Sequence, residues 1–528
     1  MMTRLIRPGL AGGISRRGIL KGSAAFGAAA LMGPLGAGRA LAQSEPKQGG
    51  TLRIGIAAGN TSDTVDPAVA EHVYVHMLLH AYNAYLTVVM PDGSLEGDLA
   101  EGWESTPDAK TWTVRLRPGV QFHDGRPVTA ADVVASIDYH RGEESTSAVK
   151  SVLAPVTELK ADGDNVVVFT LEAGNADFPV LLSDYHLPIR PAQDGKIDPL
   201  GTIGAGPFLL DHFEPGVRAS LSRNPNYFKP GLPYFDGLEL LSIVDAAARQ
   251  NALMSGQVDV IDRVDLPTVN LLERAPGIEI ISLNGGEHYG YPMDTRAAPF
   301  SDNNVRMALK LAIDRQELVD KILNGYGSVG NDMPINPSMP YFDASIEQRV
   351  YDPEKAKWHL SQAGMENLSV DLHLANSAFE SCIDSGLLYA EKAAAAGITV
   401  NVVREPDDGY WSNVWMQKPF TATYWGGRPT QDWMFSTAYV RGAEWNETYW
   451  DNERFNELIV QARVELDQAR RQEMYSEMQR LVRDEGGIII PMFANYTMAL
   501  SEKVAHPEVV GANWILDGFR APERWWFA

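Results

Sequence analysis

The sequence predicts an α/β protein built as two lobes. Strand-like alternation dominates the first half of the chain, as in residues 110–122, where Trp112, Val114 and Leu116 fall in phase. From about residue 285 onward apolar residues recur at helical spacing, with strand-like runs between the helices. After about residue 495 short strand-like pieces return. This order favours a β-rich lobe, an α/β lobe, and a C-terminal segment that returns to the first lobe.

The strands expected in the first half are short. Residues 49–58 alternate apolar and other side chains, which is typical of an edge strand or the first strand of a sheet. Residues 165–172 repeat the alternation. Residues 204–228 predict a hairpin, because two apolar stretches flank a Glu-Pro-Gly turn at 214–216.

The second half carries helix signals with their own start and stop residues. Residues 301–327 predict two helices that meet near 312–314, where Asp314 and Glu317 have the spacing of a capping box. Residues 351–364 predict one helix with an Asp-Pro start and a Gly stop. We also expect a helix and then a strand over 390–404, and two long helices followed by a strand over 453–493.

The first 42 residues are interpreted as a cleaved export signal. The run "SRRGILK" at 15–21 resembles the twin-arginine export motif, although an ordinary Sec signal with a basic start is the alternative. An uncharged run over 22–38 is too short and glycine-rich for a membrane-spanning helix, and 40–42 match a small-x-small cleavage site. Because Gln43 rather than Cys follows, we expect a periplasmic protein without a membrane anchor, exported through the twin-arginine pathway.

Composition excludes several classes of function. Residues 1–42 hold six basic and no acidic residues, so a net charge of −23 for the whole chain becomes −29 after cleavage. Such an acidic protein repels nucleic acid and anionic lipid. The single cysteine, Cys382, cannot form an internal disulfide. Common hydrolase, metal and nucleotide motifs are absent, and the Gly-x-Gly-x-x-Gly match at 325–330 follows a helix instead of the strand that a dinucleotide site requires.

Several segments resemble one protein family in order along the chain. These are "LAEGWESTPDAKTWTVRLRPGVQFHDGRPVTAADVVASI" at 99–137, the hairpin at 204–228, "DAAARQNALMSGQVDV" at 245–260, and the helical segments at 299–327 and 351–364. The family they resemble is the large extracytoplasmic solute-binding proteins of ABC importers, of the dipeptide/oligopeptide/nickel class (family 5). The resemblance extends over essentially the whole chain after residue 42.

This resemblance implies an architecture and a set of partners. It implies a two-lobed periplasmic-binding-protein fold with a hinge and an extra β-rich subdomain in the first lobe. We expect the first lobe over 43–285, with the subdomain at about 92–200, the second lobe over 286–495, and a return to the first lobe over 496–528. A solute held between the lobes would be delivered to membrane permease subunits by a monomer that needs no cofactor and catalyses no reaction.

Three histidines could in principle form a metal site. His72, His76 and His80 would share one face of a helix, and such spacing can bind Zn²⁺ or Ni²⁺. The outer pair would lie about 12 Å apart, however, which is too far for one ion. We therefore predict no metal site here. Because the family's preceding Asp-Pro loop borders the cleft, His72 or Tyr74 could contact the ligand.

Three other stretches have the composition of a cleft wall. They mix glycines, aromatic rings and polar groups at 283–295, 424–435 and 441–450. The ligand contacts predicted from these stretches are His288, Tyr289, Tyr291, Trp425, Gly426, Arg428, Asp432, Trp433, Trp445 and Asn446.

The segment at 424–435 also departs from the family pattern. In peptide-binding relatives a carboxylate near this position holds the ligand's α-ammonium, which makes Asp432 a shifted candidate here. Arg428 could pair with a ligand carboxylate, and Trp425 and Trp433 could stack on a ligand or on a cation. The alternative is that the tryptophans belong to the core and that Arg428 and Asp432 satisfy each other.

The resulting prediction is a periplasmic binding protein that captures a short peptide or an amino-acid-like zwitterion. Alternative ligands are a sugar oligomer, an opine-like conjugate, an organic amine or a nickel complex. A further role in presenting ligand to a chemoreceptor stays open. The alternative from a different class is a periplasmic amidase or esterase, although no nucleophile constellation is visible in the sequence.

Overall fold

The computed structural model describes residues 45–528 apart from 71, 408 and 444. The predicted signal at 1–42 lies outside these residues and stays a prediction. Among the described residues, no helix has both the length and the apolar character needed to cross a membrane.

A seven-stranded sheet forms the centre of the first lobe. Its order is β10-β11-β12-β1-β13-β21-β14, so strand β21 from the end of the chain lies between two strands from the first half. The sequence predicts an edge strand or a first strand over residues 49–58. β1 is the first strand in chain order, and because two parallel neighbours flank it inside the sheet, the edge alternative is wrong. The strands are β1 (Thr51–Ile56), β10 (Phe208–Glu214), β11 (Arg218–Arg223), β12 (Gly237–Ser242), β13 (Val260–Ile261), β14 (Ile278–Leu283) and β21 (Tyr496–Ser501).

Helices and short C-terminal elements complete this part of the first lobe. Its apolar core contains Leu52, Tyr74, Phe208 and Trp525, which come from both ends of the chain. The predicted hairpin is confirmed as β10 and β11, with Gly216 at φ +67° in the turn. The elements are α1 (Val73–Tyr82), α5 (Ala246–Met254), α6 (Val269–Glu273), β22 (Val504–Ala505), α15 (Ile515–Gly518), α16 (Ala521–Arg524) and β23 (Trp526–Phe527).

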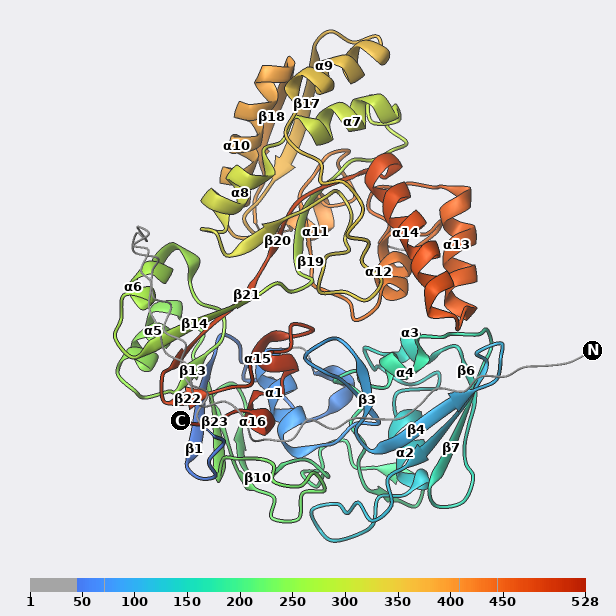
Figure 1. Ribbon diagram of the computed structural model, residues 1–528, viewed down its shortest axis with the longest axis vertical. Helices are drawn as coiled ribbons and strands as arrows, with labels where there is room; N and C mark the ends of the chain where they lie inside the picture. The colour runs from blue at the N-terminus through green and yellow to red at the C-terminus, as the bar shows by residue number, and fades with distance from the viewer. Residues whose placement is uncertain (1–44, 71, 408, 444) are drawn as a thin grey trace, which may run out of the picture. The chain divides into compact units, whose positions relative to one another are not determined.

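A separate antiparallel sheet, ordered β4-β5-β7-β6, forms the β-rich part of the first lobe. It has its own core, in which Trp112, Val114 and Leu116 are buried as their alternation predicts. The short β2–β3 hairpin extends from the same region (Figure 1). The elements are β2 (Thr87–Val89), β3 (Leu95–Gly97), β4 (Ala100–Ser105), β5 (Thr111–Leu116), α2 (Ala130–Asp138), α3 (Lys150–Leu153), β6 (Val156–Ala161), β7 (Val166–Leu171), α4 (Phe178–Leu181), β8 (Ala192–Gln193) and β9 (Lys196–Ile197).

The second lobe combines a four-stranded sheet, ordered β16-β20-β15-β19, with a parallel pair, β17-β18. These strands are β15 (His288–Pro292), β16 (Gly327–Val329), β17 (Leu368–Leu374), β18 (Ile398–Arg404), β19 (Thr423–Trp425) and β20 (Ile488–Ala494). The helices are α7 (Asn303–Leu311), α8 (Arg315–Ile322), α9 (Pro353–Gln362), α10 (Cys382–Ala393), α11 (Tyr410–Asn413), α12 (Gln431–Ala438), α13 (Glu453–Val464) and α14 (Gln468–Glu485). Both predicted N-caps are confirmed, because Asp314 accepts from the Glu317 amide and Asp352 from the Lys355 amide. The Glu317 carboxylate pairs with Lys321 and Lys392, so the capping box expected at Asp314 is formed only in part.

Two chain segments connect the lobes. β14 continues through residues 284–287 into β15, and β20 continues through Asn495 into β21 (Figure 1). At the first crossing the backbones are very close, because a Cβ on Gly286 would lie 2.6 Å from the Gly427 Cα. Only glycine fits this position without displacing the facing backbone. The domain boundaries expected at 285 and 495 fall within these crossings and stay predictions.

Candidate functional site

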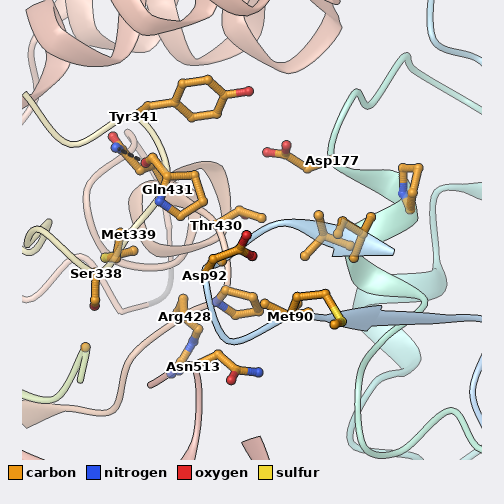
Figure 2. A pocket seen from close by; sticks show the side chains of 18 of the residues that line it. Met90, Asp92, Asp177, Ser338, Met339, Tyr341, Arg428, Thr430, Gln431 and Asn513 are labelled. Carbon is orange, nitrogen blue, oxygen red and sulfur yellow. Dashed lines mark hydrogen bonds between the residues drawn. The ribbon is translucent and has the colours of Figure 1, made fainter. Parts of the chain in front are cut away.

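A cavity of about 570 Å³ lies between the lobes. Figure 2 shows side chains that line it. From the first lobe it is lined by the β2–β3 hairpin, by residues 176–180 around the start of α4, and by Ala512 and Asn513. From the second lobe it is lined by residues 337–341, by the loop 427–431, and by the region where α13 leads into α14. Its size and its mixed apolar and polar lining are typical of a small-molecule site.

Arg428 is one of the cations that line this cavity. It lies on the loop between β19 and α12, where its Nη1 donates to the backbone oxygens of Gly426 at 3.0 Å and Gly427 at 3.3 Å. Burial lowers the pKa of Arg428. Within the described part of the chain, no carboxylate forms an ion pair with it. The charge of Asp184 acts on Arg428, but Asp184 is itself hydrogen-bonded to His186 at 2.7 Å. The guanidinium is therefore suited to a ligand carboxylate.

The guanidinium of Arg428 contacts the ring of Trp425. Its guanidinium carbon lies 5.7 Å from the ring centroid of Trp425. The Trp425 indole donates to one oxygen of Glu447 at 2.9 Å, and the Trp415 indole donates to the other. Glu447 is almost completely buried, and this desolvation raises its pKa to about 7 even though the indole bonds favour the carboxylate.

Asp177 and Arg471 form an ion pair across the two lobes. Their Oδ1 and Nη1 atoms are 2.9 Å apart, and the side chains are only 10% and 2% exposed. The Arg471 guanidinium also lies over the rings of Tyr341 and Tyr475, at 5.1 and 5.4 Å. Burial alone would lower the pKa of Arg471, but the hydrogen bond and charge of Asp177 hold it above its usual value. This pair joins the lobes through protein groups alone.

Asp92 lines the cavity from the turn of the β2–β3 hairpin. Its Oδ1 accepts hydrogen bonds from the Ser94 amide at 3.0 Å and the Ser94 hydroxyl at 2.6 Å. These bonds lower the pKa of Asp92, so its carboxylate is ionised at neutral pH. The side chain remains exposed to the cavity and solvent.

Only part of the predicted site residues surrounds the cavity. Arg428 lines it, and Gly426 supplies a backbone oxygen that holds Arg428. Trp433 lines a second small space, of about 20 Å³, together with the first-lobe residues Asn513 and Trp514. Trp425 is not among the residues that line the cavity, but its ring contacts the guanidinium of Arg428.

Asp432 has a different environment from the one predicted. It is 8% exposed and pairs with Arg463 at 3.1 Å, within the second lobe. Burial raises the pKa of Asp432, which the charge of Arg463 opposes. Neither interlobe cavity is lined by Asp432, and Arg428 does not pair with it. The structure thus gives Asp432 a structural partner where the sequence suggested a ligand ammonium.

The remaining predicted residues have partners in the lobes and line neither interlobe cavity. His72 is the N-cap residue of α1 and pairs with Asp63, whereas His76 and His80 lie within the helix. No group of three or more metal-ligating side chains is found in the described ranges. The other placements are Tyr74 donating to the Glu214 carbonyl, His288 bonded to the Gly286 carbonyl, Tyr289 stacked on Phe379, Tyr291 bonded to Ser385, Asn446 donating to the Trp450 carbonyl, and Trp445 packed on Trp425 with 45% exposure.

Comparison with known proteins gives consistent matches. Residues 94–447 match the family described as "Bacterial extracellular solute-binding proteins, family 5 Middle". The chain is 26% identical over 484 residues to the probable D,D-dipeptide-binding periplasmic protein DdpA of Escherichia coli (strain K12), covering 86% of this chain and 90% of that protein.

Solved structures match over nearly the same extent. HbpA2 from Haemophilus parasuis has a TM-score of 0.79 at 20% identity, covering 88% of this chain and 98% of that one. AgaA from A. tumefaciens R10, in complex with agropinic acid, has a TM-score of 0.71 at 25% identity, covering 91% and 99%. These structures confirm the predicted two-lobed α/β fold.

Proposed function

Because the chain belongs to the bacterial extracellular solute-binding proteins of family 5, we propose that it is the periplasmic substrate-binding component of an ABC importer. It captures a short peptide or an amino-acid-like solute in the cavity between its lobes. It then delivers this solute, as a monomer, to the membrane permease.

One observation carries this proposal. The 570 Å³ cavity is lined from both lobes, and its second-lobe wall presents Arg428, which forms no ion pair with a carboxylate among the residues that the structure describes. A solute that contacts both lobes favours the closed arrangement over the open one, because only closure forms both sets of contacts. A carboxylate on that solute would supply the charge that Arg428 lacks.

The named relatives support a ligand of this kind. DdpA is named for D,D-dipeptides, and the AgaA structure contains agropinic acid. A dipeptide and an opine-like acid both offer a carboxylate to Arg428, so an opine-like conjugate is the second candidate. A sugar oligomer, an organic amine and a nickel complex are the other ligand classes to be tested.

Export and class of activity are part of the same proposal. The twin-arginine motif at 15–21 supports export to the periplasm through that pathway. The chain acts by binding and not by catalysis. The competing hypothesis of an amidase or esterase requires turnover, which a binding protein lacks.

A thermal-shift screen of the purified protein tests the proposal. The arms are dipeptides, agropinic acid, oligosaccharides, organic amines and Ni²⁺, and ester and amide hydrolysis is measured in parallel. A bound solute at 100 times its Kd adds about 2.7 kcal/mol of stability. We expect stabilisation by a carboxylate-bearing peptide or conjugate. Turnover of an ester or amide, with no shift from any solute, would refute the binding function.

A further inference from the structure

We infer that Asp92 and Arg428 are the two charged halves of the ligand site, one on each lobe. The ligand class that follows is a zwitterion whose cationic group faces Asp92 of the first lobe and whose carboxylate faces Arg428 of the second. This inference rests on the proposed solute-binding function and specifies the ligand and its orientation.

The charges that line the cavity lead to this assignment. Among the described residues that line the cavity, the charged ones are two aspartates and two arginines. Asp177 and Arg471 neutralise each other at 2.9 Å. One anion and one cation are left, and they lie on opposite lobes, since Asp92 belongs to the β2–β3 hairpin and Arg428 to the loop after β19 (Figure 2).

The two remaining charges do not satisfy each other. Asp92 and Arg428 are not within the 4.0 Å of an ion pair, although both line the same cavity. Among the described residues, the hydrogen-bond acceptors of Arg428 are backbone oxygens. The charge of Asp184 acts on it, but Asp184 is hydrogen-bonded to His186 and does not line this cavity. A ligand placed between the two side chains can contact both.

The Asp92 carboxylate is held in a geometry suited to a cation. Both hydrogen bonds from Ser94 go to Oδ1, which fixes the side chain and leaves Oδ2 to accept from a ligand. The turn that carries it is tight, with Gly93 at φ +83°. A ligand ammonium beside this carboxylate forms charge-assisted hydrogen bonds, as a ligand carboxylate does beside Arg428.

The placement of the two charged side chains on different lobes determines which ligands the site selects. A zwitterion gains both charge-assisted contacts only when the lobes are closed, whereas a solute lacking either charge leaves one side chain unpaired. The site therefore discriminates against N-acylated peptides through Asp92 of the first lobe and against C-amidated peptides through Arg428 of the second.

Calorimetric titration with three matched probes tests this assignment. The probes are L-alanyl-L-alanine, its N-acetyl derivative and its C-terminal amide. The variants are Asp92→Asn and Arg428→Gln, with Glu96→Gln on the same hairpin and Arg404→Gln on the second lobe as exposed controls.

We expect each site variant to weaken the zwitterionic dipeptide at least tenfold, in line with the loss of one charge-assisted contact. Asp92→Asn should not change the affinity for the N-acetyl probe, and Arg428→Gln should not change that for the amide. Both controls should match the unmodified protein for all three probes.

The negative outcomes are distinguishable. If the unmodified protein binds none of the three probes, the proposed peptide function fails and the inference fails with it. If it binds the dipeptide and Asp92→Asn retains that affinity within twofold, the function stands and the assignment of Asp92 is refuted. If Asp92→Asn weakens the dipeptide and the N-acetyl probe equally, Asp92 only shapes the hairpin and the inference is overturned.

Discussion

The buried carboxyl group of Glu447 makes the stability of this protein depend on pH in a defined window. It is 5% exposed and forms no ion pair among the described residues, and both of its oxygens accept from indole N–H groups. Desolvation raises its pKa from 4.5 to about 7. The folded protein therefore holds this proton more tightly than the unfolded chain does.

The size and direction of the effect follow from linkage. The contribution of the protonated group to folding is complete below about pH 4.5 and is lost as the pH rises to about 7. This difference between the folded and unfolded pKa of Glu447 corresponds to about 3 kcal/mol of unfolding free energy. Glu447→Gln removes the titration, but its amide can accept only one of the two indole hydrogen bonds, so the variant carries a constant penalty at every pH.

The assay compares urea unfolding of Glu447→Gln and the unmodified protein at pH 4.5 to 8. Other buried acids titrate in both proteins and cancel in the difference. As the pH rises from 4.5 to 8, we expect the unfolding free energy of the variant to increase by about 3 kcal/mol relative to that of the unmodified protein. The exposed variant Glu473→Gln on α14 is the control. Parallel stability profiles for Glu447→Gln and the unmodified protein would refute the buried-carboxyl argument.

Three further predictions concern the lobes. Asp177→Asn removes the carboxylate that pairs with Arg471 across the lobes, so we expect a larger radius of gyration by small-angle scattering; an unchanged radius would show that the pair does not stabilise closure. Asp432→Ala removes the carboxylate that pairs with Arg463, so we expect the free energy of unfolding in urea to fall by about 2 kcal/mol while the dipeptide affinity is unchanged. Unchanged stability with a weakened dipeptide affinity would instead assign Asp432 to the ligand site. Gly286→Ala places a Cβ 2.6 Å from the Gly427 Cα, so its melting temperature should fall by several degrees, whereas Gly102→Ala, whose Cβ meets nothing within 4 Å and whose φ, like that of Gly286, is not positive, should change it little.

The fold could be predicted from the sequence because its signals are local. The alternation at 112–116 and the Asp caps at 314 and 352 depend on neighbours within a few residues, and the structure confirms them. The position of β1 inside its sheet could not be predicted, because strand order depends on pairing with β12 and β13, about 200 residues away.

The site was less predictable because side-chain direction and distant pairing decide it. Composition drew attention to the loop with Arg428, which lines the cavity, but the adjacent Trp425 and Asp432 bond to Glu447 and Arg463 within the second lobe. Asp92 and Asp177 carry no local signal that distinguishes them from other surface acids. Their importance follows only from the cavity that brings them opposite the second lobe.

The Asp177–Arg471 ion pair and the unpaired charges of Asp92 and Arg428 differ in their dependence on ligand, and this difference explains how closure can report binding. The Asp177–Arg471 pair forms between protein groups and stabilises closure whether or not the cavity is filled. Asp92 and Arg428, in contrast, stabilise closure only when a zwitterion lies between them. Desolvation offsets much of the attraction in a buried pair, which keeps the ligand-independent contribution small. The ligand-dependent contacts then set the difference between the empty and loaded populations, because a ligand shifts an equilibrium only by its differential affinity for the two states.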